Sequence, residues 1–491
     1  MRRRRACLFA HAPGKGRVLW LAVAGLLAVS CGDDADDRAA PDRATTTAAP
    51  AVETSTTAPT TTAPPATLPP PSPGTCPNPP PYAAPAPDRP AYDVAASIDV
   101  PAGTVEGTVA VAFTPDLPTD ILVLRLWPNG PAPSSTGTHT DILSTAVDGA
   151  AVTSTQPAPT VLELPAGRML APGDRMTATV GFRVVLGGPL DDRWSRNGES
   201  LRLGSFVPLL SWEPGVGWAR EPPTSLFAEA VSSPVADWTL RLDVTPGYDV
   251  LASGRRDESG AWQAPAVRDV GVSVGRFDLA STTAPAPDPV EVTVGVDASV
   301  GDDPNAYLTR VTAALQDFAA RFGPYPYDTY TLAITPGLGG GIEFPAHVMQ
   351  GPGTAGRTTP HEVAHQWFYA LVGNNQGRDP WLDEGLASWA EFRHDGTLAD
   401  AVGRDIPAAG QGRLGEPMTY WEDHRSAYYR GVYVQGAAAL ASLGDADLVD
   451  CALRLYTAVN AHDVATSGDL VEALAVVFPD AGARLAVFGA G

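Results

Sequence analysis

Residues 361–391 read HEVAHQWFYALVGNNQGRDPWLDEGLASWAE, and this stretch decides the fold and the chemistry of the chain. His361 and His365 are four residues apart, so on an α-helix both imidazoles lie on one face, one turn apart. Glu384 follows after eighteen intervening residues, inside a second expected helix. Two imidazoles and one carboxylate leave a fourth tetrahedral position open, which is the ligand set of a catalytic zinc ion. We therefore predict one Zn²⁺ per chain, held by His361, His365 and Glu384.

Glu362 lies directly beside the first of these ligands. A carboxylate at that place reaches a water molecule at the metal and can act as a general base. The alternative is a solvated His/Glu helix face, because a five-residue HExxH pattern also arises by chance. The additional Glu384, at a workable spacing, favours the metal site with Glu362 as a catalytic residue.

The N-terminus is typical of an exported protein. Six basic residues and no acid lie within residues 1–17, and a twelve-residue apolar run follows at 18–29. A run this short is the core of a signal peptide, because a membrane-spanning helix needs about twenty residues. We expect residues 1–30 to be removed. The segment Ala28-Val29-Ser30-Cys31 is similar to a bacterial lipobox, so a lipid on Cys31 would anchor the chain outside the cell membrane. Ordinary secretion is the alternative.

Residues 31–90 are dominated by Thr, Ala and Pro from Ala39 onward. Such a segment cannot bury enough apolar surface to offset its chain entropy, so we predict a disordered tether. Cys76 and Cys451 form an even pair in an oxidising compartment, where a disulfide between them is favoured. The net charge of −22 argues against a nucleic-acid partner.

Residues 91–289 predict an antiparallel β domain, built as a saddle or a sandwich. Its short runs alternate apolar and polar residues, as in TVEGTVAVAF at 104–113 and DWTLRLDV at 237–244, with Pro, Gly and Asp between them. We expect an Ala/Pro-rich linker at 282–289 to end this domain.

Residues 290–491 predict a mainly helical α+β catalytic domain. A helix begins with Asp303 as its N-cap and Pro304 in its first turn, keeps apolar residues at helical spacing, and ends at Gly323. Most of the sequence after residue 355 also has a helical pattern.

The stretch TLAITPGLGGGIEF, residues 331–344, supplies a further acid to the site. TLAIT is typical of a strand, and Gly340 and Gly341 allow the backbone to come close to a ligand. An edge strand here could pair with an extended peptide, and Glu343 could meet the free ammonium group of that peptide. The alternative for Glu343 is a solvated residue near a turn.

Three motifs resemble the gluzincin zinc aminopeptidases of the aminopeptidase N and leukotriene hydrolase kind. They are HEVAH with Glu384 in the frame WLDEGLAS, the segment GGIEF at 340–344, and the segment YVQGA at 433–437. The resemblance implies a thermolysin-like catalytic domain after a β saddle domain. It also implies that Tyr433 is the catalytic tyrosine and that Glu343, Gly340 and Gly341 bind the amino terminus of a substrate.

The chain departs from the family pattern at several places. Ile342 and Phe344 replace the usual Met and Asn or Tyr, Gln435 replaces Lys, and Asp383 replaces the common Asn before the ligand. The chain ends 58 residues after Tyr433. We therefore expect the large C-terminal helical domain of many relatives to be missing and the cleft to be more open.

These observations predict a zinc aminopeptidase that acts on peptides with a free N-terminus. A zinc endopeptidase would share the metal chemistry and would also cleave N-acetylated peptides. A catalytically decayed binding protein of the cell envelope would bind zinc without turnover. An epoxide or ester hydrolase is a further alternative on this scaffold.

Overall fold

The computed structural model describes residues 66–226 and 232–490. The expected signal peptide, Cys31 and the tether up to residue 65 lie outside this part of the chain. Among the described residues, no helix is long and apolar enough to cross a membrane.

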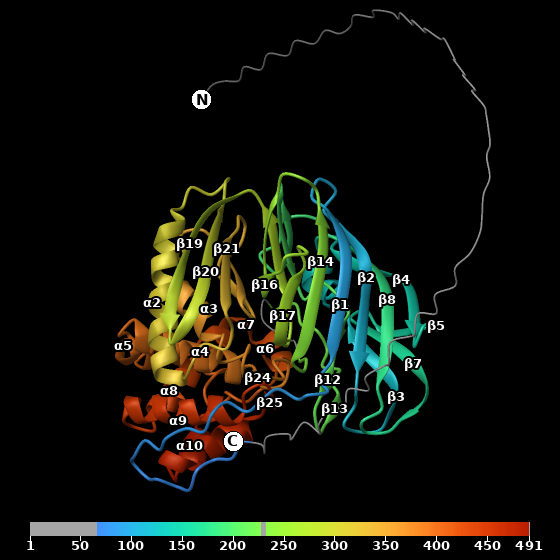
Figure 1. Cartoon of the computed structure of the whole chain (residues 1–491). Helices are drawn as coiled ribbons and strands as arrows, with labels where there is room; N and C mark the ends of the chain where they lie inside the picture. The colour runs from blue at the N-terminus through green and yellow to red at the C-terminus, as the bar shows by residue number, and fades with distance from the viewer. Residues whose placement is uncertain (1–65, 227–231, 491) are drawn as a thin grey trace, which may run out of the picture. The chain divides into compact units, whose positions relative to one another are not determined.

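The β domain is built from one large sheet and two smaller ones (Figure 1). The eight-stranded sheet has the order β16 (Arg255–Arg256), β17 (Trp262–Val267), β14 (Ala236–Val244), β1 (Ala91–Asp99), β2 (Thr104–Phe113), β8 (Met176–Val185), β4 (His139–Val147), β5 (Ala150–Ala151). One four-stranded sheet has the order β15 (Asp249–Ala252), β18 (Gly271–Gly275), β10 (Ser200–Gly204), β9 (Trp194–Asn197). The other has the order β11 (Leu209–Leu210), β3 (Thr119–Arg125), β7 (Val161–Leu170), β6 (Thr155–Ala158). A short hairpin, β12 (Trp212–Glu213) and β13 (Gly217–Trp218), completes the domain together with η1 (Trp127–Asn129) and α1 (Pro131–Ser134).

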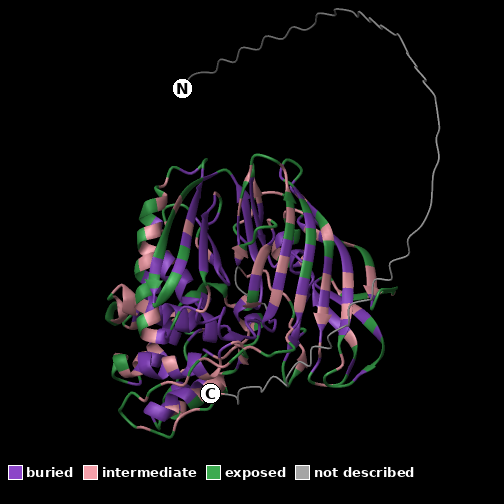
Figure 2. Ribbon diagram, in the orientation of Figure 1, coloured by how far each residue is buried: buried purple, intermediate pink, exposed green. Residues whose placement is uncertain are grey.

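The alternation seen in the sequence becomes the burial pattern of these strands. In β1 every second residue is buried, including Tyr92, Val94 and Ile98. Figure 2 shows the same alternation along neighbouring strands of the large sheet. One face of the sheet therefore packs on the core while the other faces water.

The catalytic domain begins with a second sheet, of five strands. Its order is β19 (Phe277–Ala286), β20 (Asp288–Asp297), β21 (Thr329–Ile334), β23 (His347–Gln350), β22 (Gly341–Phe344). The predicted linker at 282–289 is wrong, because these residues form the turn and the ends of the β19–β20 hairpin. Pro285 is tolerated because β19 is an outermost strand, and Pro289 lies before Glu291, where the pairing of β20 with β21 begins. The five-stranded sheet thus begins at Phe277, before the boundary predicted near residue 290.

Helix α2 (Pro304–Phe322) forms where the sequence predicts a helix, and it lies against this sheet. The Asp303 side chain accepts a hydrogen bond from the amide of Asn305, and Gly323 ends the helix with a φ of 107°. A positive φ of this size is readily adopted only by glycine.

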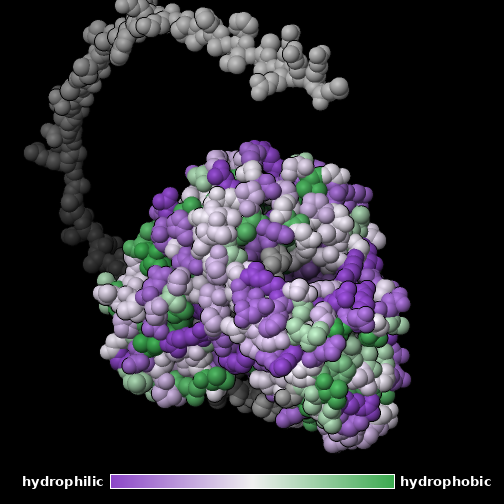
Figure 3. Space-filling view, turned by 180° about the vertical axis from the view of Figure 1, so that it is seen from behind, coloured by the Kyte–Doolittle hydropathy of each residue, from purple (hydrophilic) through white to green (hydrophobic). Residues whose placement is uncertain are grey.

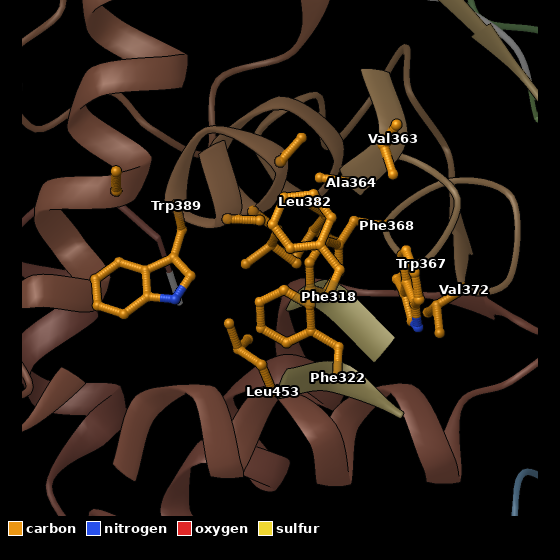
Figure 4. Packing of buried hydrophobic residues seen from close by; sticks show 14 of the residues in the cluster. Phe318, Phe322, Val363, Ala364, Trp367, Phe368, Val372, Leu382, Trp389 and Leu453 are labelled. Carbon is orange, nitrogen blue, oxygen red and sulfur yellow. The ribbon is translucent and has the colours of Figure 1, made fainter. Parts of the chain in front are cut away.

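The remaining helices enclose the metal-binding motif. They are α3 (Thr358–Ala364), α4 (Trp381–His394), α5 (Leu398–Val402), α6 (Met418–Asp423), α7 (Arg425–Tyr429), the π-helical turn η2 (Arg430–Val434), α8 (Gln435–Ala441), α9 (Ala446–Val459), α10 (Ser467–Val477) and α11 (Ala481–Ala486). A short parallel pair, β24 (Gly373–Asn374) and β25 (Val464–Ala465), lies among them. Figure 4 shows Phe318 and Phe322 of α2 packed with Val363 and Ala364 of α3 and with Trp389 of α4 in one apolar core.

Residues 66–90 form an ordered strap along the catalytic domain, so the predicted tether is too long at this end. The backbone amide of Ser72 donates to the carbonyl of Val476, and that of Ala83 donates to the carbonyl of Ala458. Cys76 and Cys451 form the expected disulfide, with their Cα atoms 5.7 Å apart. In Figure 1 the strap is the blue segment that passes α9 and α10 before it enters β1. These distant contacts offset the chain entropy that the Pro/Thr composition alone cannot.

The surface mixes hydrophilic and hydrophobic residues, as the view from behind shows (Figure 3). The large apolar side chains that are exposed in the described part are spread over separate elements, for example Leu143, Met169 and Leu279. Scattered apolar residues of this kind need no partner.

Candidate active site

Three ligand atoms converge between α3 and α4. Nε2 of His361 lies 3.1 Å from Oε2 of Glu384 and 3.2 Å from Nε2 of His365. Nε2 of His365 lies 3.5 Å from the same Glu384 oxygen. Ligands about 2.0–2.2 Å from a tetrahedral Zn²⁺ are about 3.3 Å apart, so these three side chains fit one ion. All three residues are buried, and the sequence spacing predicted this set.

His365 is oriented by an acid on its far side. Its Nδ1 lies 2.6 Å from Oδ1 of Asp383, and the amide of Gln376 donates to Oδ2 of Asp383 over 2.5 Å. A carboxylate at Nδ1 fixes the imidazole tautomer and leaves Nε2 as the ligand atom. Hydrogen bonds from His361 and His365 outweigh burial and hold the pKa of Glu384 well below its usual range.

His361 also faces a second acid, Glu391, which lies about three turns after the start of α4. Nδ1 of His361 lies 3.2 Å from Oε2 of Glu391, an ion-pair separation without hydrogen-bond alignment. Arg357 donates from Nε to the other oxygen of Glu391. Although burial alone would lower it, the neighbouring carboxylates of Glu384 and Glu391 raise the pKa of His361 to about 9.

Two further carboxylates face the ligand set from the edge strand and from α3. Oε1 of Glu343 and Oε2 of Glu362 are buried and have no hydrogen-bond partner. Glu343, Glu362 and His365 offer atoms that lie within 4.8 Å of one another. Burial raises the pKa of Glu343 to about 8 and that of Glu362 to about 7. Buried carboxylates without partners favour a cation beside them.

Gly341 makes this arrangement possible. A Cβ atom on Gly341 would lie 2.4 Å from Cγ of Glu362. Strand β22 therefore approaches α3 closely enough to set Glu343 and Glu362 side by side, and it is the outermost strand of its sheet, as predicted. Gly340 also lines the cleft, and its carbonyl accepts a hydrogen bond from the amide of Gly351 over 2.8 Å.

Tyr433 completes the set from the π-helical turn. Its hydroxyl donates to Oε1 of Glu384 over 2.5 Å, and its ring is stacked on that of His361 with centroids 5.6 Å apart. Burial beside Glu384 keeps the pKa of Tyr433 well above its ordinary value, so the hydroxyl stays protonated. π-Helical turns occur frequently at functional sites. Neighbouring Tyr428 packs edge-on against the Tyr433 ring, and Tyr429 lies at the rim of the cleft.

One cleft of about 270 Å³ joins the three ligands, Glu343, Glu362 and Tyr433. It is lined by Asp192, Arg193, Gly340, Gly341, Ile342, Glu343, Arg357, Thr358, His361, Glu362, His365, Glu384, Glu391, Tyr429 and Tyr433. The β domain contributes Asp192 and Arg193 to this wall.

The buried Arg202 fixes the β domain against the glycine-rich loop. Its guanidinium donates to the carbonyls of Asp192 and Pro336 over 2.8 and 2.9 Å and to Oγ1 of Thr335 over 3.0 Å. Oδ1 of Asp191 accepts from the amide of Gly339 over 2.7 Å. These hydrogen bonds fix the position of the cleft wall relative to the loop before β22.

The structure thus brings every predicted site residue into one cleft and adds others that the sequence did not reveal. Glu391 carried a usable signal, since it follows Glu384 by seven residues and so lies on the same face of α4. Arg357 carried a similar signal, since it precedes His361 by four residues at the start of α3. Asp192 and Arg193 carried none, because only the tertiary fold places them here.

The peptidase family M1 domain matches residues 353–408 of the chain. Over 117 residues the chain is 31% identical to leukotriene A-4 hydrolase of Xenopus laevis, in an alignment that covers 22% of this chain and 19% of that protein. The match therefore spans about a fifth of the length of this relative.

Solved structures share the fold over a greater length. The M1 zinc metallopeptidase from Deinococcus radiodurans has a TM-score of 0.63 at 20% identity and covers 82% of this chain and 93% of its own. A variant of that enzyme bound to a Tyr-Ser-Ala substrate has a TM-score of 0.58 at 19% identity, covering 82% and 94%. A two-domain M1 zinc metallopeptidase variant bound to L-tryptophan has a TM-score of 0.58 at 19% identity, covering 84% and 96%.

These likenesses confirm the predicted fold class, a β domain followed by a thermolysin-like peptidase domain. Together with the zinc motif, they make the chain similar to the gluzincins of the aminopeptidase N and leukotriene hydrolase family.

Proposed function

We propose that this chain is a zinc-dependent aminopeptidase that removes N-terminal residues from peptides. One observation carries the proposal: three converging ligand atoms share one cleft with Glu343 and Glu362, each of which has one buried oxygen without a hydrogen-bond partner. A metal-activated water needs a base, and an exopeptidase needs a group that meets the ammonium of its substrate.

His361, His365 and Glu384 would hold the Zn²⁺, which supplies Lewis-acid polarisation of the scissile carbonyl and acidification of water. Glu362 takes the proton of the attacking water and passes it to the leaving amine. Tyr433 donates its hydroxyl to the oxygen of the carbonyl as negative charge develops there.

Glu343 anchors the free ammonium and so restricts cleavage to the first residue. Its buried, unpartnered oxygen and the small residues Gly340 and Gly341 beside it support this role. The bound Tyr-Ser-Ala and L-tryptophan of the structural relatives show that this fold accepts peptides and amino acids in those proteins.

Glu362→Gln tests the assignment of the base. The purified variant should retain wild-type zinc content and lose activity on aminoacyl-anilides by several orders of magnitude. Chelation should abolish the wild-type activity, and added zinc should restore it. Substantial turnover by zinc-loaded Glu362→Gln would refute the role of Glu362.

We also propose that the chain is exported and anchored by a lipid on Cys31, with the folded part outside the cell. The short apolar run before Cys31 and the disulfide at Cys76 and Cys451 support an oxidising compartment. Labelling of cells with a fatty-acid analogue should mark the wild type and not Cys31→Ala. Equal recovery of both proteins in the culture medium would contradict the anchor.

A further inference from the structure

We propose that the chain forms a two-fold symmetric dimer through β19, an outermost strand of the five-stranded sheet. Two copies of β19 pair antiparallel and join the sheets of two chains into one. The inference goes beyond the proposed aminopeptidase function, and the exposed backbone of this strand carries it.

The length of β19 distinguishes it from the other outermost strands of the described sheets. β19 has ten residues, Phe277–Ala286, whereas each of the others has between two and four. Short edge strands and β-bulges are two of the features that keep a sheet from pairing with another chain. β19 pairs with β20 along its whole length without a register shift, so neither feature protects its free edge. Figure 1 shows β19 next to α2.

The hydrogen bonds around β19 show which of its backbone groups face outward. The amide of Glu291, opposite Thr283, donates to the carbonyl of Asp328 on the far side of β20. The Thr283–Glu291 pair is therefore a non-hydrogen-bonded pair, and the N–H and C=O groups of Thr283 point away from β20. Every second residue of β19 does the same, and Phe277 agrees, because its amide donates to Oδ2 of Asp249 in the β domain.

Leu279, Ser281 and Thr283 accordingly present a row of unpaired backbone groups at the surface. Among the described residues, none accepts a hydrogen bond from these three amides. All three residues are exposed. The residues between Asp278 and Pro285 include no charged residue and no proline. The residues that discourage pairing thus lie only at the two ends of this row.

A second copy of the same strand fits this row. When two copies pair antiparallel about Ser281, Leu279 of each lies opposite Thr283 of the other. Each of the outward-facing pairs then exchanges two backbone hydrogen bonds. Asp278 lies opposite Ala284 of the second copy and far from the other Asp278, so no like charges meet across the strands. This contact uses the same surface on both chains and closes as a dimer.

The face of α2 beside this edge also permits the approach of a second copy. Gln316, Ala319 and Ala320 of α2 line one hollow together with Pro285 and Pro287. These α2 side chains are small or uncharged, so two α2 helices come near each other without like charges between them.

Sedimentation velocity over a range of protein concentrations tests the dimer. The sample is the exported chain, residues 31–491, with Cys31→Ser to exclude a lipid. It should reach twice the mass of one chain as the concentration rises. Ser281→Pro should raise the dissociation constant at least about tenfold, because proline removes the central outward donor and none of the bonds to β20. Ser281→Ala is the matched control, since it loses the same side-chain contact with Thr293 but keeps the amide, and it should dimerise.

Two double variants test the register and decide the matter if Ser281→Pro does not fold. Leu279→Lys with Thr283→Lys should be monomeric, because lysines of the two copies lie opposite each other. Leu279→Lys with Thr283→Glu should dimerise, because each lysine then lies opposite a glutamate of the second copy. Every folded variant should keep the wild-type kcat/KM per chain, since Glu343 lies on β22 at the opposite edge of the sheet.

Three results would overturn the dimer. They are a wild type that stays monomeric at every concentration, a folded Ser281→Pro that associates like the wild type, and equal association of the two double variants. None of these results depends on peptide cleavage, so the aminopeptidase proposal stands or fails separately.

Discussion

Asp383 lies 2.6 Å from Nδ1 of His365 through its Oδ1 atom, so a carboxylate occupies a place where the related enzymes commonly have asparagine. The pair is fully buried, and Gln376 holds the second oxygen of Asp383. A negative charge at Nδ1 increases the electron density that Nε2 offers to a metal. This contact therefore favours Nε2 of His365 as a metal ligand.

Replacing Asp383 should weaken zinc binding in two steps. Asp383→Asn keeps an acceptor for His365 but loses the charge, and Asp383→Ala loses both, so we expect zinc affinity to fall by about tenfold and about a hundredfold. Competition with a chromogenic chelator measures this directly. Asp400→Asn, at an exposed position of α5, is the control. Equal zinc affinity of all four proteins would refute the role of Asp383.

Tyr433→Phe should lower kcat by about 10²–10³ and leave KM and zinc content nearly unchanged. The hydroxyl touches Glu384 but the three ligand atoms meet without it. Steady-state kinetics on aminoacyl-anilides, with metal analysis of the same sample, gives the answer. A rise in KM at constant kcat would mean that Tyr433 binds the substrate without stabilising the transition state.

Acid should destabilise the junction of the two domains through His347. This residue of β23 is fully buried, with Nε2 3.0 Å from Oγ of Ser273 in the β domain and Nδ1 2.7 Å from Oγ1 of Thr331. Burial lowers the pKa of His347 to about 3 from its ordinary 6.5. Its contribution to stability is therefore complete above pH 6.5 and is lost progressively as the pH falls towards 3.

Between pH 7.5 and pH 5 the wild type should lose about 2 kcal/mol more unfolding free energy than His347→Gln does. Urea unfolding at both pH values measures the difference. The half-exposed His139→Gln serves as the control and should follow the wild type. Parallel losses in wild type and His347→Gln would show that other groups cause the acid sensitivity.

Breaking the disulfide should release the strap without harming catalysis at low temperature. Cys451 lies on α9, which contributes no residue to the described cleft. We expect Cys76→Ser to lower stability by about 2–5 kcal/mol, seen as a lower thermal midpoint, while kcat at 25 °C stays at the wild-type value. Loss of activity well below the unfolding temperature would show that the strap supports the site.

Local sequence signals predicted those parts of the fold that depend on neighbouring residues. Asp303 and Gly323 mark both ends of α2, and period-two alternation marks β2 and β14. The parallel pairing of β1 with β14 could not be predicted, because the partners are far apart in the chain. The proline-rich composition of residues 282–289 and 66–90 led to wrong predictions of a linker and a tether. Residues 282–289 are ordered by strand pairing, and residues 66–90 are ordered by a disulfide and contacts with distant residues.

In the active site too, local sequence signals were predictive and long-range contacts were not. His361, His365 and Glu384 were predictable because their spacing is fixed by two helices, and Glu343 because an edge strand and its glycines mark it. Asp383 was visible only as a departure from the family pattern, and its contact with His365 needed the fold. Asp192 and Arg193 reach the cleft through tertiary packing alone.

The central claim is that this site cleaves peptides only from a free amino terminus. The most direct measurement compares leucyl peptides with their N-acetylated forms on purified, zinc-quantified residues 66–491, together with Glu343→Gln. We expect cleavage of the free-amine forms only, lost with chelator, and a large rise in KM in Glu343→Gln. Efficient cleavage of the N-acetylated forms would contradict the account and would assign the same zinc site to an endopeptidase.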